Sequence, residues 1–152
     1  MGYEYKETVT KAGTIEVITG NYLIDDMRIP SPTSIDCEYH IRTRARNDAD
    51  DITHIKTIRL KRAVTWHYKN VSNETFKKIF DYIIKDNLMT KGNMTFNVQT
   101  QFIGEIKPIV MKMYAGSPIT AQSVHGSKGR LLVTFDVHFI EPEGVELTQL
   151  GQ

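Results

Sequence analysis

The sequence predicts a mainly β, α+β domain: an antiparallel β-sandwich or barrel with one packed α-helix over about residues 72–86. Three observations support this class. Apolar residues recur at every second position in several short segments, which is the period of a half-buried strand. A single segment has apolar residues at helical spacing, the pattern of an amphipathic helix. Turns bearing Gly or Pro separate these segments, as expected between strands.

The length of 152 residues suits one domain. We expect a flexible N-terminal arm over 1–12, a single β-rich domain over 13–142 and a polar C-terminal tail over 143–152. Both outer segments are polar and mixed in charge, so they offer little apolar surface for packing.

The first half of the domain begins with a short alternating strand at 14–19, a turn at 20–21, and a small hairpin with Asp25 and Asp26 at its tip. The segment 30–32 carries two prolines and precedes a strand rather than lying within one. In that strand one face is predicted to be buried: Ile35, Cys37, Tyr39 and Ile41.

Residues 42–51 have no apolar periodicity, so we expect a loop that is basic first and acidic second. Segment 58–67 alternates again, but Arg62 falls on its apolar face. This predicts either a bulge near Arg62 and Ala63 or a face that is not wholly buried.

The helix is predicted to begin at Ser72, a good N-cap. Its apolar side consists of Phe76, Ile79, Phe80, Ile83 and Ile84. We expect its end near residues 86–87. Further strands are predicted at 94–102, 107–114, 118–124 and 131–139, with a glycine turn at 126–129. The total is about seven or eight strands.

Composition excludes several classes of function. The net charge is +1, which argues against a dedicated nucleic-acid binder and against a polybasic membrane anchor. Cys37 is the sole cysteine, so no internal disulfide is expected and a cytosolic environment is the simplest inference. We find no apolar signal segment and no apolar run of roughly 20 residues, the length that crosses a bilayer.

The motif search predicts no catalytic residue, no metal ligand and no cofactor. None of the five histidines has the spacing of a metal or catalytic motif. Asp48, Asp50 and Asp51 resemble part of a calcium loop, but its glycine and terminal glutamate are missing. Cys37 lies on an apolar strand face, where a small buried hydrophobe is the simpler interpretation. We therefore expect a protein that is not an enzyme.

A charged cluster is the feature most typical of a binding surface. Three arginines in the 42–51 loop and three basic residues at 59–62 can share one surface if the segments are neighbours. The cluster is either a patch for phosphate or an acidic partner, or a solvated face balanced by the nearby aspartates. The candidate inter-subunit contacts are Arg42, Arg44, Arg46, Asp48, Asp50, Asp51, Arg59 and Lys61.

Segment 21–141 resembles a family of small tail structural proteins of Firmicute phages and prophages. Three stretches carry the resemblance: the proline-bearing strand start at 29–35, the basic strand ending in Trp66 with the helix that follows, and the final strands around a glycine turn at 111–118 and 131–141. The order of strands, one helix and strands is also similar to that of tail-tube and distal-tail proteins. The N-terminal arm and the acid-rich 42–51 loop depart from the pattern.

The resemblance implies a virion structural protein, assembled in the cytoplasm of a bacterial host. It would form homo-oligomeric rings, expected to be hexameric, in the tail tube or at its distal end as an initiator, adaptor or baseplate part. Its partners would be neighbouring tail proteins. DNA would pass through a channel without specific recognition, and the chain would not enter a membrane. The alternatives are a β-sandwich binding module for a carbohydrate or peptide, and a small enzyme whose catalytic residues are scattered in the sequence.

Overall fold

The structure is a computed structural model that describes residues 6–9, 15–47, 53–84, 92, 94–116, 119–126 and 129–148. Over these residues it is mainly antiparallel β with a single helix, which confirms the predicted class. The main sheet has nine strands and is open, so it does not close into a barrel. The elements are β1 (Lys6–Val9), β2 (Ile15–Ile18), β3 (Leu23–Ile24), β4 (Met27–Arg28), β5 (Ser34–Asn47), β6 (Thr53–Ser72), α1 (Asn73–Asp81), β7 (Phe96–Thr100), β8 (Ile109–Ala115), β9 (Ala121–His125), β10 (Leu131–Ile140) and β11 (Val145–Thr148).

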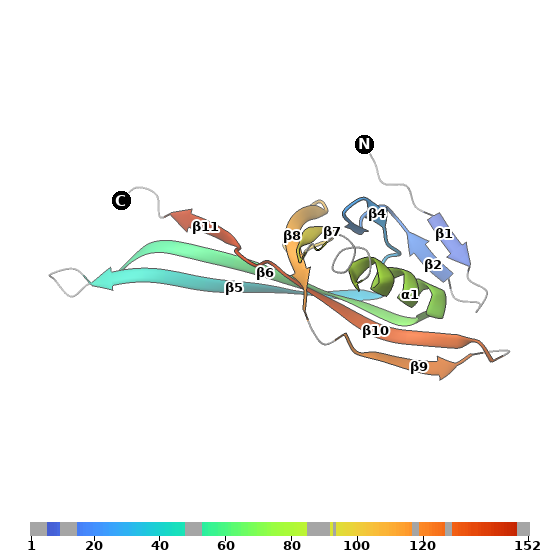
Figure 1. The fold of residues 1–152 in the computed structure, drawn as a ribbon. Helices are drawn as coiled ribbons and strands as arrows, with labels where there is room; N and C mark the ends of the chain where they lie inside the picture. Colours follow the sequence, from blue (N-terminus) through green and yellow to red (C-terminus); the bar gives the residue numbers. More distant parts are fainter. Residues whose placement is uncertain are drawn as a thin grey trace.

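Strand β6 organises the sheet. Its 20 residues pair with β5 along one edge, from His67 down to Thr53. On the other edge, β11 pairs with residues 57–60 and β10 with residues 63–72. β10 extends the sheet through β9 and, at its far end, through β8, β7, β3 and β4. Figure 1 shows the β5–β6 hairpin projecting from a body in which α1, β7 and β8 gather over β6 and β10.

The core lies in this body and is built on aromatic residues whose polar atoms are satisfied. Trp66 is fully buried, with its ring 4.8 Å from that of Phe139. Its indole N–H donates to the Thr100 hydroxyl at 2.9 Å. The buried Tyr68 hydroxyl donates to the carbonyl of Pro30 at 2.7 Å. Because each buried donor has an acceptor, these large rings add apolar area without leaving an unpaired polar group.

The helix begins as predicted. The Thr75 amide donates to the hydroxyl of Ser72, the N-cap, at 3.2 Å. Of the predicted apolar side, Ile79 and Ile83 are buried, and Phe76 and Ile84 are packed against the core. The ring of Phe80 stacks on that of Phe76 at 5.6 Å. α1 ends at Asp81 and one wider helical turn follows over residues 82–84. The end expected near residues 86–87 lies outside the described residues.

The loop expected over residues 42–51 is a strand at its start, which corrects the prediction. β5 continues to Asn47 and β6 begins at Thr53. The register shifts between Arg44 and Ala45, and the ladder then continues. Backbone pairing needs no apolar side chain, so a strand that leaves the core loses its apolar period and keeps its hydrogen bonds. Residues 48–52 are outside the described part of the chain.

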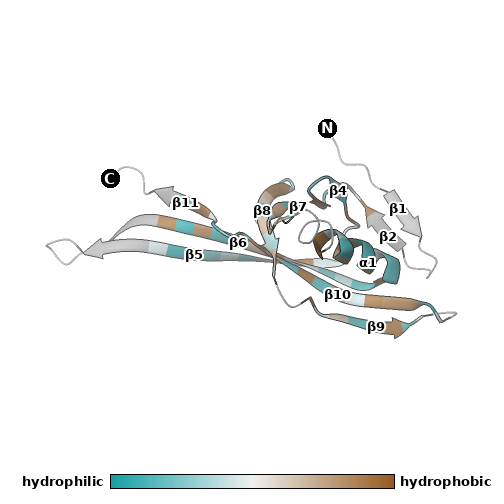
Figure 2. Cartoon of the chain, in the orientation of Figure 1, coloured by the Kyte–Doolittle hydropathy of each residue, from teal (hydrophilic) through white to brown (hydrophobic). Residues whose placement is uncertain are grey.

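The apolar face predicted for β5 is half correct. Ile35 and Cys37 pack against the core, whereas Tyr39 is 45% exposed and Ile41 is 66% exposed. The alternation is real, but β5 passes beyond the body as it enters the projecting part of the hairpin. Figure 2 shows the hydrophilic colouring of much of β5 beside the alternating colours of β6.

The two terminal segments also contain strands. Part of the N-terminal arm is β1, which pairs with β2. A polar tail was expected after Pro142, but part of it forms the strand β11, which pairs with β6. Gly144 makes the turn before β11 with φ +72°, and a Cβ there would lie 2.4 Å from the Leu60 carbonyl oxygen. The position therefore requires glycine. The hairpin predicted with Asp25 and Asp26 at its tip is confirmed between β3 and β4.

We predict that Trp66→Ala lowers the free energy of unfolding by about 3–5 kcal/mol, because it opens a cavity in the core. The measurement is chemical denaturation followed by circular dichroism. Ile106→Ala is the matched control: Ile106 is 97% exposed, so its change is expected within about 0.5 kcal/mol. Equal effects of the two substitutions would contradict this description of the core.

Candidate functional site

A groove of about 640 Å³ lies on the β5–β6 hairpin, next to the turn between β10 and β11. We call it the basic groove, because four of its residues are His40 and Arg42 from β5 and Arg59 and Lys61 from β6. The remaining lining residues are Tyr39, Ile41, Pro142 and Glu143. The size is within the range of sites that bind small molecules or a few side chains.

The register of the hairpin places basic residues opposite one another, and two of them, Arg42 and Arg59, carry like charges. Arg42 is paired with Arg59, and His40 with Lys61. Directly opposed residues of an antiparallel pair lie on the same face, where like charges destabilise the sheet. The basic groove is therefore an arrangement that an anion would stabilise.

Arg59 is held in place by the strand that follows the turn. Its guanidinium donates to Glu146 Oε2 at 2.8 Å and to the carbonyl oxygen of Glu143 at 2.6 Å. Arg42 and Lys61 form no ion pair with the described residues. Arg42 and Lys61 can thus pair with a ligand, beside Arg59, whose guanidinium is already oriented by its hydrogen bonds to Glu146 and Glu143.

The structure brings together three of the predicted contact residues: Arg42, Arg59 and Lys61. Arg44 and Arg46 continue along β5 toward the tip of the hairpin, with side chains outside the described set. Asp48, Asp50 and Asp51 lie outside the described residues altogether. Arg62 does not belong to the cluster, because its side chain is on the opposite face of β6.

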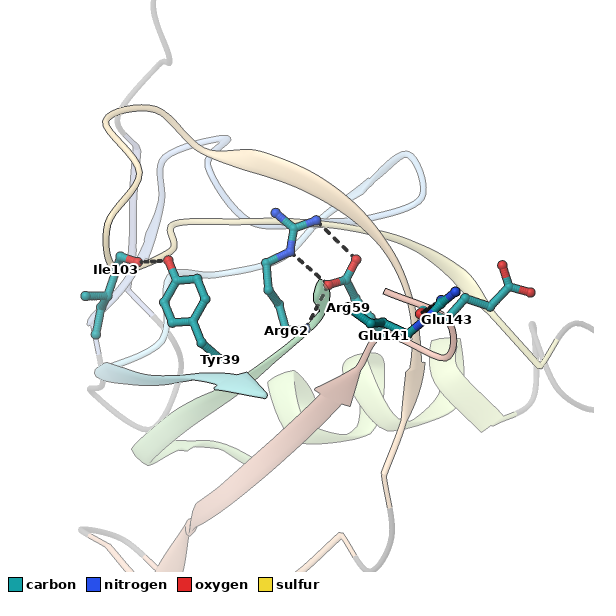
Figure 3. A network of polar contacts seen from close by, with 6 residues as sticks. All are labelled: Tyr39, Arg59, Arg62, Ile103, Glu141 and Glu143. Carbon is teal, nitrogen blue, oxygen red and sulfur yellow. Dashed lines mark hydrogen bonds and ion pairs between the residues drawn. The ribbon is translucent and has the colours of Figure 1, made fainter. Parts of the chain in front are cut away.

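Arg62 is instead neutralised by Glu141, a residue that the sequence analysis missed (Figure 3). The guanidinium donates to both carboxylate oxygens of Glu141, at 2.8 and 3.1 Å, and the Arg62 backbone N–H donates to one of them at 2.8 Å. The Glu141 side chain is 8% exposed. β6 passes Arg62 without a shift in register, so of the two predicted alternatives the bulge is wrong. The other, a face that is not wholly buried, is confirmed: the Arg62 side chain is 21% exposed and Tyr39, opposite it on the same face, is 45% exposed. The sequence signal for this ion pair is the position of Glu141, an acidic residue directly after the apolar run of β10.

The loop between β7 and β8 is braced against β5 beside this pair. The Tyr39 hydroxyl donates to the Ile103 carbonyl at 2.5 Å, as Figure 3 shows. The Tyr39 ring lies edge-on to Phe102 at 5.2 Å. A Cβ at Gly104 would meet the Tyr39 hydroxyl oxygen at 2.8 Å, so a residue without a side chain is needed there. Burial raises the pKa of the nearby Cys37 thiol, which disfavours the reactive thiolate.

A second polar cluster joins three strands on the face that carries the basic groove. His67 of β6 contacts Asp36 of β5 through Nε2 and Asp136 of β10 through Nδ1, both at 2.5 Å. Burial lowers the pKa of His67, but its hydrogen bonds to Asp136 and Asp36 outweigh that effect, and the net pKa is raised. The protonated ring donates to both carboxylates. This cluster therefore fastens the sheet most firmly when His67 is charged.

The described residues contain no group of three or more His, Cys, Asp or Glu side chains arranged to hold a metal ion. The search for a helix able to span a membrane, made over the same part of the chain, found none. The cationic side chains of the basic groove are hydrogen-bond donors, which suit carboxylate or phosphate oxygens.

We predict that Glu141→Gln lowers the free energy of unfolding by about 3 kcal/mol, because it leaves the half-buried Arg62 without its counter-charge. Arg62→Leu/Glu141→Leu should recover part of that loss, since no unpaired charge remains. The exposed pair of Arg59 and Glu146 supplies the control, and Glu146→Gln should cost less than about 1 kcal/mol. Denaturant unfolding of the four proteins measures the differences. A Glu141→Gln effect no larger than that of the control would refute the role of this pair.

We predict that His67 stabilises the fold at acidic pH. Its folded pKa lies above the unfolded value of about 6.5, so its contribution is full below that value and is lost as pH rises through the folded pKa. Relative to His67→Gln, the wild-type protein should gain up to about 1 kcal/mol at pH near 5.5 and little at pH near 9. Unfolding of both proteins across this range tests it, and a pH-independent difference would exclude the charged triad.

The chain matches no protein-family model, and no curated protein is significantly similar to it.

Proposed function

We propose that this chain is a non-enzymatic structural subunit of a phage-type tail, which forms rings by joining the sheets of neighbouring copies. The observation that carries the proposal is a pair of sheet edges. Among the described residues, β5 pairs with β6 alone and β9 pairs with β10 alone. Unpaired edges of this kind are a hazard in a free monomer and are useful where another chain supplies the missing strand.

The two edges are compatible with each other. Strands β5, β6, β10 and β9 are neighbours in that order, and each pairing between them is antiparallel. β5 and β9 therefore run in opposite directions at opposite sides of one sheet. β9 of one copy is oriented to add antiparallel to β5 of the next, which joins two different surfaces. Such heterologous joints close into rings when the rotation between copies allows it.

The shape of the hairpin supports assembly as well. At about 3.3 Å per residue, the 20 residues of β6 extend over roughly 65 Å. A compact domain of this length has a radius of gyration of about 15 Å. The hairpin thus reaches well past the body, as Figure 1 shows, and it exposes Tyr39 and Ile41 on the way. A projecting arm with exposed apolar residues is what contact with a neighbour requires.

The tail assignment itself rests on the resemblance to phage tail proteins, whose order of strands, one helix and strands is shared here. Rings in the tail tube or at its distal end, with six copies expected, are the form that this resemblance implies. A ring built by edge pairing needs no catalytic group, in keeping with a site of cations and backbone edges. DNA would pass through the channel and neighbouring tail proteins would stack on the ring.

We predict that blocking the β9 edge abolishes ring formation. Proline substitutions at two successive positions, Ser123→Pro and Val124→Pro, form a matched pair. Along an edge strand, successive backbone N–H groups point alternately toward the neighbouring strand and toward the free edge. One of the two prolines therefore removes a hydrogen bond to β10, and the other removes a donor from the free edge. The variant that keeps the wild-type melting temperature is the edge variant, and it should be monomeric by light scattering and electron microscopy.

The wild-type protein should form closed rings in the same experiments, alone or with neighbouring tail proteins. A wild-type protein that stays monomeric at high concentration and with those proteins would overturn the proposal. Rings that persist in the edge variant would show that the joint is made elsewhere.

A further inference from the structure

We propose that the basic groove binds a phosphate group, carried by inorganic phosphate or by a small organic phosphate. The inference goes beyond the proposed function, because it concerns a ligand of the single chain and requires no second copy. It depends on Arg42 of β5, on Arg59 and Lys61 of β6, and on the turn between β10 and β11. The groove's volume of about 640 Å³ has room for a phosphate together with an organic group.

The free charge of the groove matches that of phosphate. Arg42 and Lys61 form no ion pair with the described residues. A phosphate group carries about −1.5 to −2 charges at pH 7, so one phosphate balances both cations. A single carboxylate carries one negative charge and would leave one of the two cations unpaired. The charge balance therefore favours phosphate over carboxylate.

Arg59 adds donors whose direction is already fixed. Its guanidinium donates from Nη1 to the Glu143 carbonyl oxygen at 2.6 Å and from Nη2 to the Glu146 carboxylate at 2.8 Å. A guanidinium carries five N–H donors, so three are left once these two bonds are made. Arg42 lies directly opposite on β5, and directly opposed side chains share one face with Cβ atoms about 5 Å apart. A phosphate between the two guanidinium groups would accept from both and relieve their repulsion.

Lys61 is the diagonal neighbour of Arg42 on the same face of the hairpin. It is paired with His40, two residues along the ladder from the pairing of Arg42 with Arg59. Diagonal neighbours of an antiparallel pair are about 7–8 Å apart, within reach of long side chains. The two free cations can therefore converge on one phosphate, to which Arg42 offers two parallel N–H donors and Lys61 a point charge.

The experiment titrates the full-length protein with inorganic phosphate and, separately, with phenyl phosphate, at constant ionic strength in a calorimeter. At least one of them should bind saturably with a Kd at or below about 1 mM. Tighter binding of phenyl phosphate assigns the site to an organic phosphate, and equal or weaker binding assigns it to the free ion. Acetate should bind at least about ten-fold more weakly than phosphate, because it carries one charge.

A groove variant and a matched surface variant locate the site. Arg42→Gln/Lys61→Gln should weaken phosphate binding at least about ten-fold, because hydrogen bonds to a charged group are lost. Arg28→Gln/Lys112→Gln removes as much positive charge at exposed positions outside the described lining of the groove, and should bind like wild type. Circular dichroism confirms that both variants are folded.

Glu143 provides a substitution of the opposite sign. It is the one acidic residue in the described lining of the groove. Glu143→Gln keeps the carbonyl oxygen that accepts from Arg59 and removes a negative charge that repels an anion. This variant should bind phosphate more tightly than wild type in the same titration.

Three results would overturn the phosphate site. The first is the absence of saturable binding of either phosphate compound up to about 10 mM. The second is an equal loss in the groove variant and the surface variant, which would show a response to net charge alone. The third is acetate binding as tight as that of phosphate. Duplex DNA that binds where neither phosphate compound does would assign the groove to a nucleic-acid backbone and would also overturn a small phosphate ligand.

The β9 edge variant separates this inference from the proposed function. It should bind phosphate like wild type, because β9 does not line the groove among the described residues. Saturable phosphate binding by a wild-type protein that forms no rings would refute the edge joint and support the groove site. Rings without phosphate binding would do the reverse.

Discussion

The rest of the structure depends on the hydrogen-bonding of one strand, β6, along both of its edges. Its inner half lies between β5 and β10 and carries Trp66 and Tyr68 into the core. Its outer half lies between β5 and β11 and carries Arg59 and Lys61 to the basic groove. Because the ladder is continuous, the position of the groove follows from the register set in the core. A slip of one residue would exchange the two faces along the whole hairpin.

Charge is placed differently on the two faces of that strand. On the core side, Arg62 is tolerated because Glu141 offers both carboxylate oxygens and also accepts from the Arg62 backbone. A buried charge without such a partner would be costly. On the other side, Arg59 pairs with Glu146, whereas Arg42 and Lys61 form no ion pair with the described residues. The charge of Arg62 is thus neutralised within the chain, whereas the charges of Arg42 and Lys61 remain for another molecule.

The proposed edge joint uses parts of the chain that contribute little to its own core. β9 is exposed at each of its five positions, and the outer part of β5 exposes Tyr39 and Ile41. Edge pairing would supply affinity through backbone hydrogen bonds, which carry little information about the partner. The result is a subunit whose stability resides in the body and whose proposed interactions reside in its sheet edges.

The sequence by itself determined the elements whose signals are local. Alternation predicted the strands around Trp66 and Phe135, and the N-cap at Ser72 with its apolar side predicted the helix. It also located Arg42, Arg59 and Lys61 as a possible shared surface. Tertiary structure decided the rest. The extension of β5 to Asn47 has a backbone partner but no apolar period. The strand at Val145–Thr148 alternates only two apolar residues, Val145 and Leu147, which is too short a pattern to predict a strand by itself. The partnership of Arg62 with Glu141 joins residues 79 apart. Pairing across such distances depends on which strands become neighbours, and local spacing in the sequence does not encode that choice.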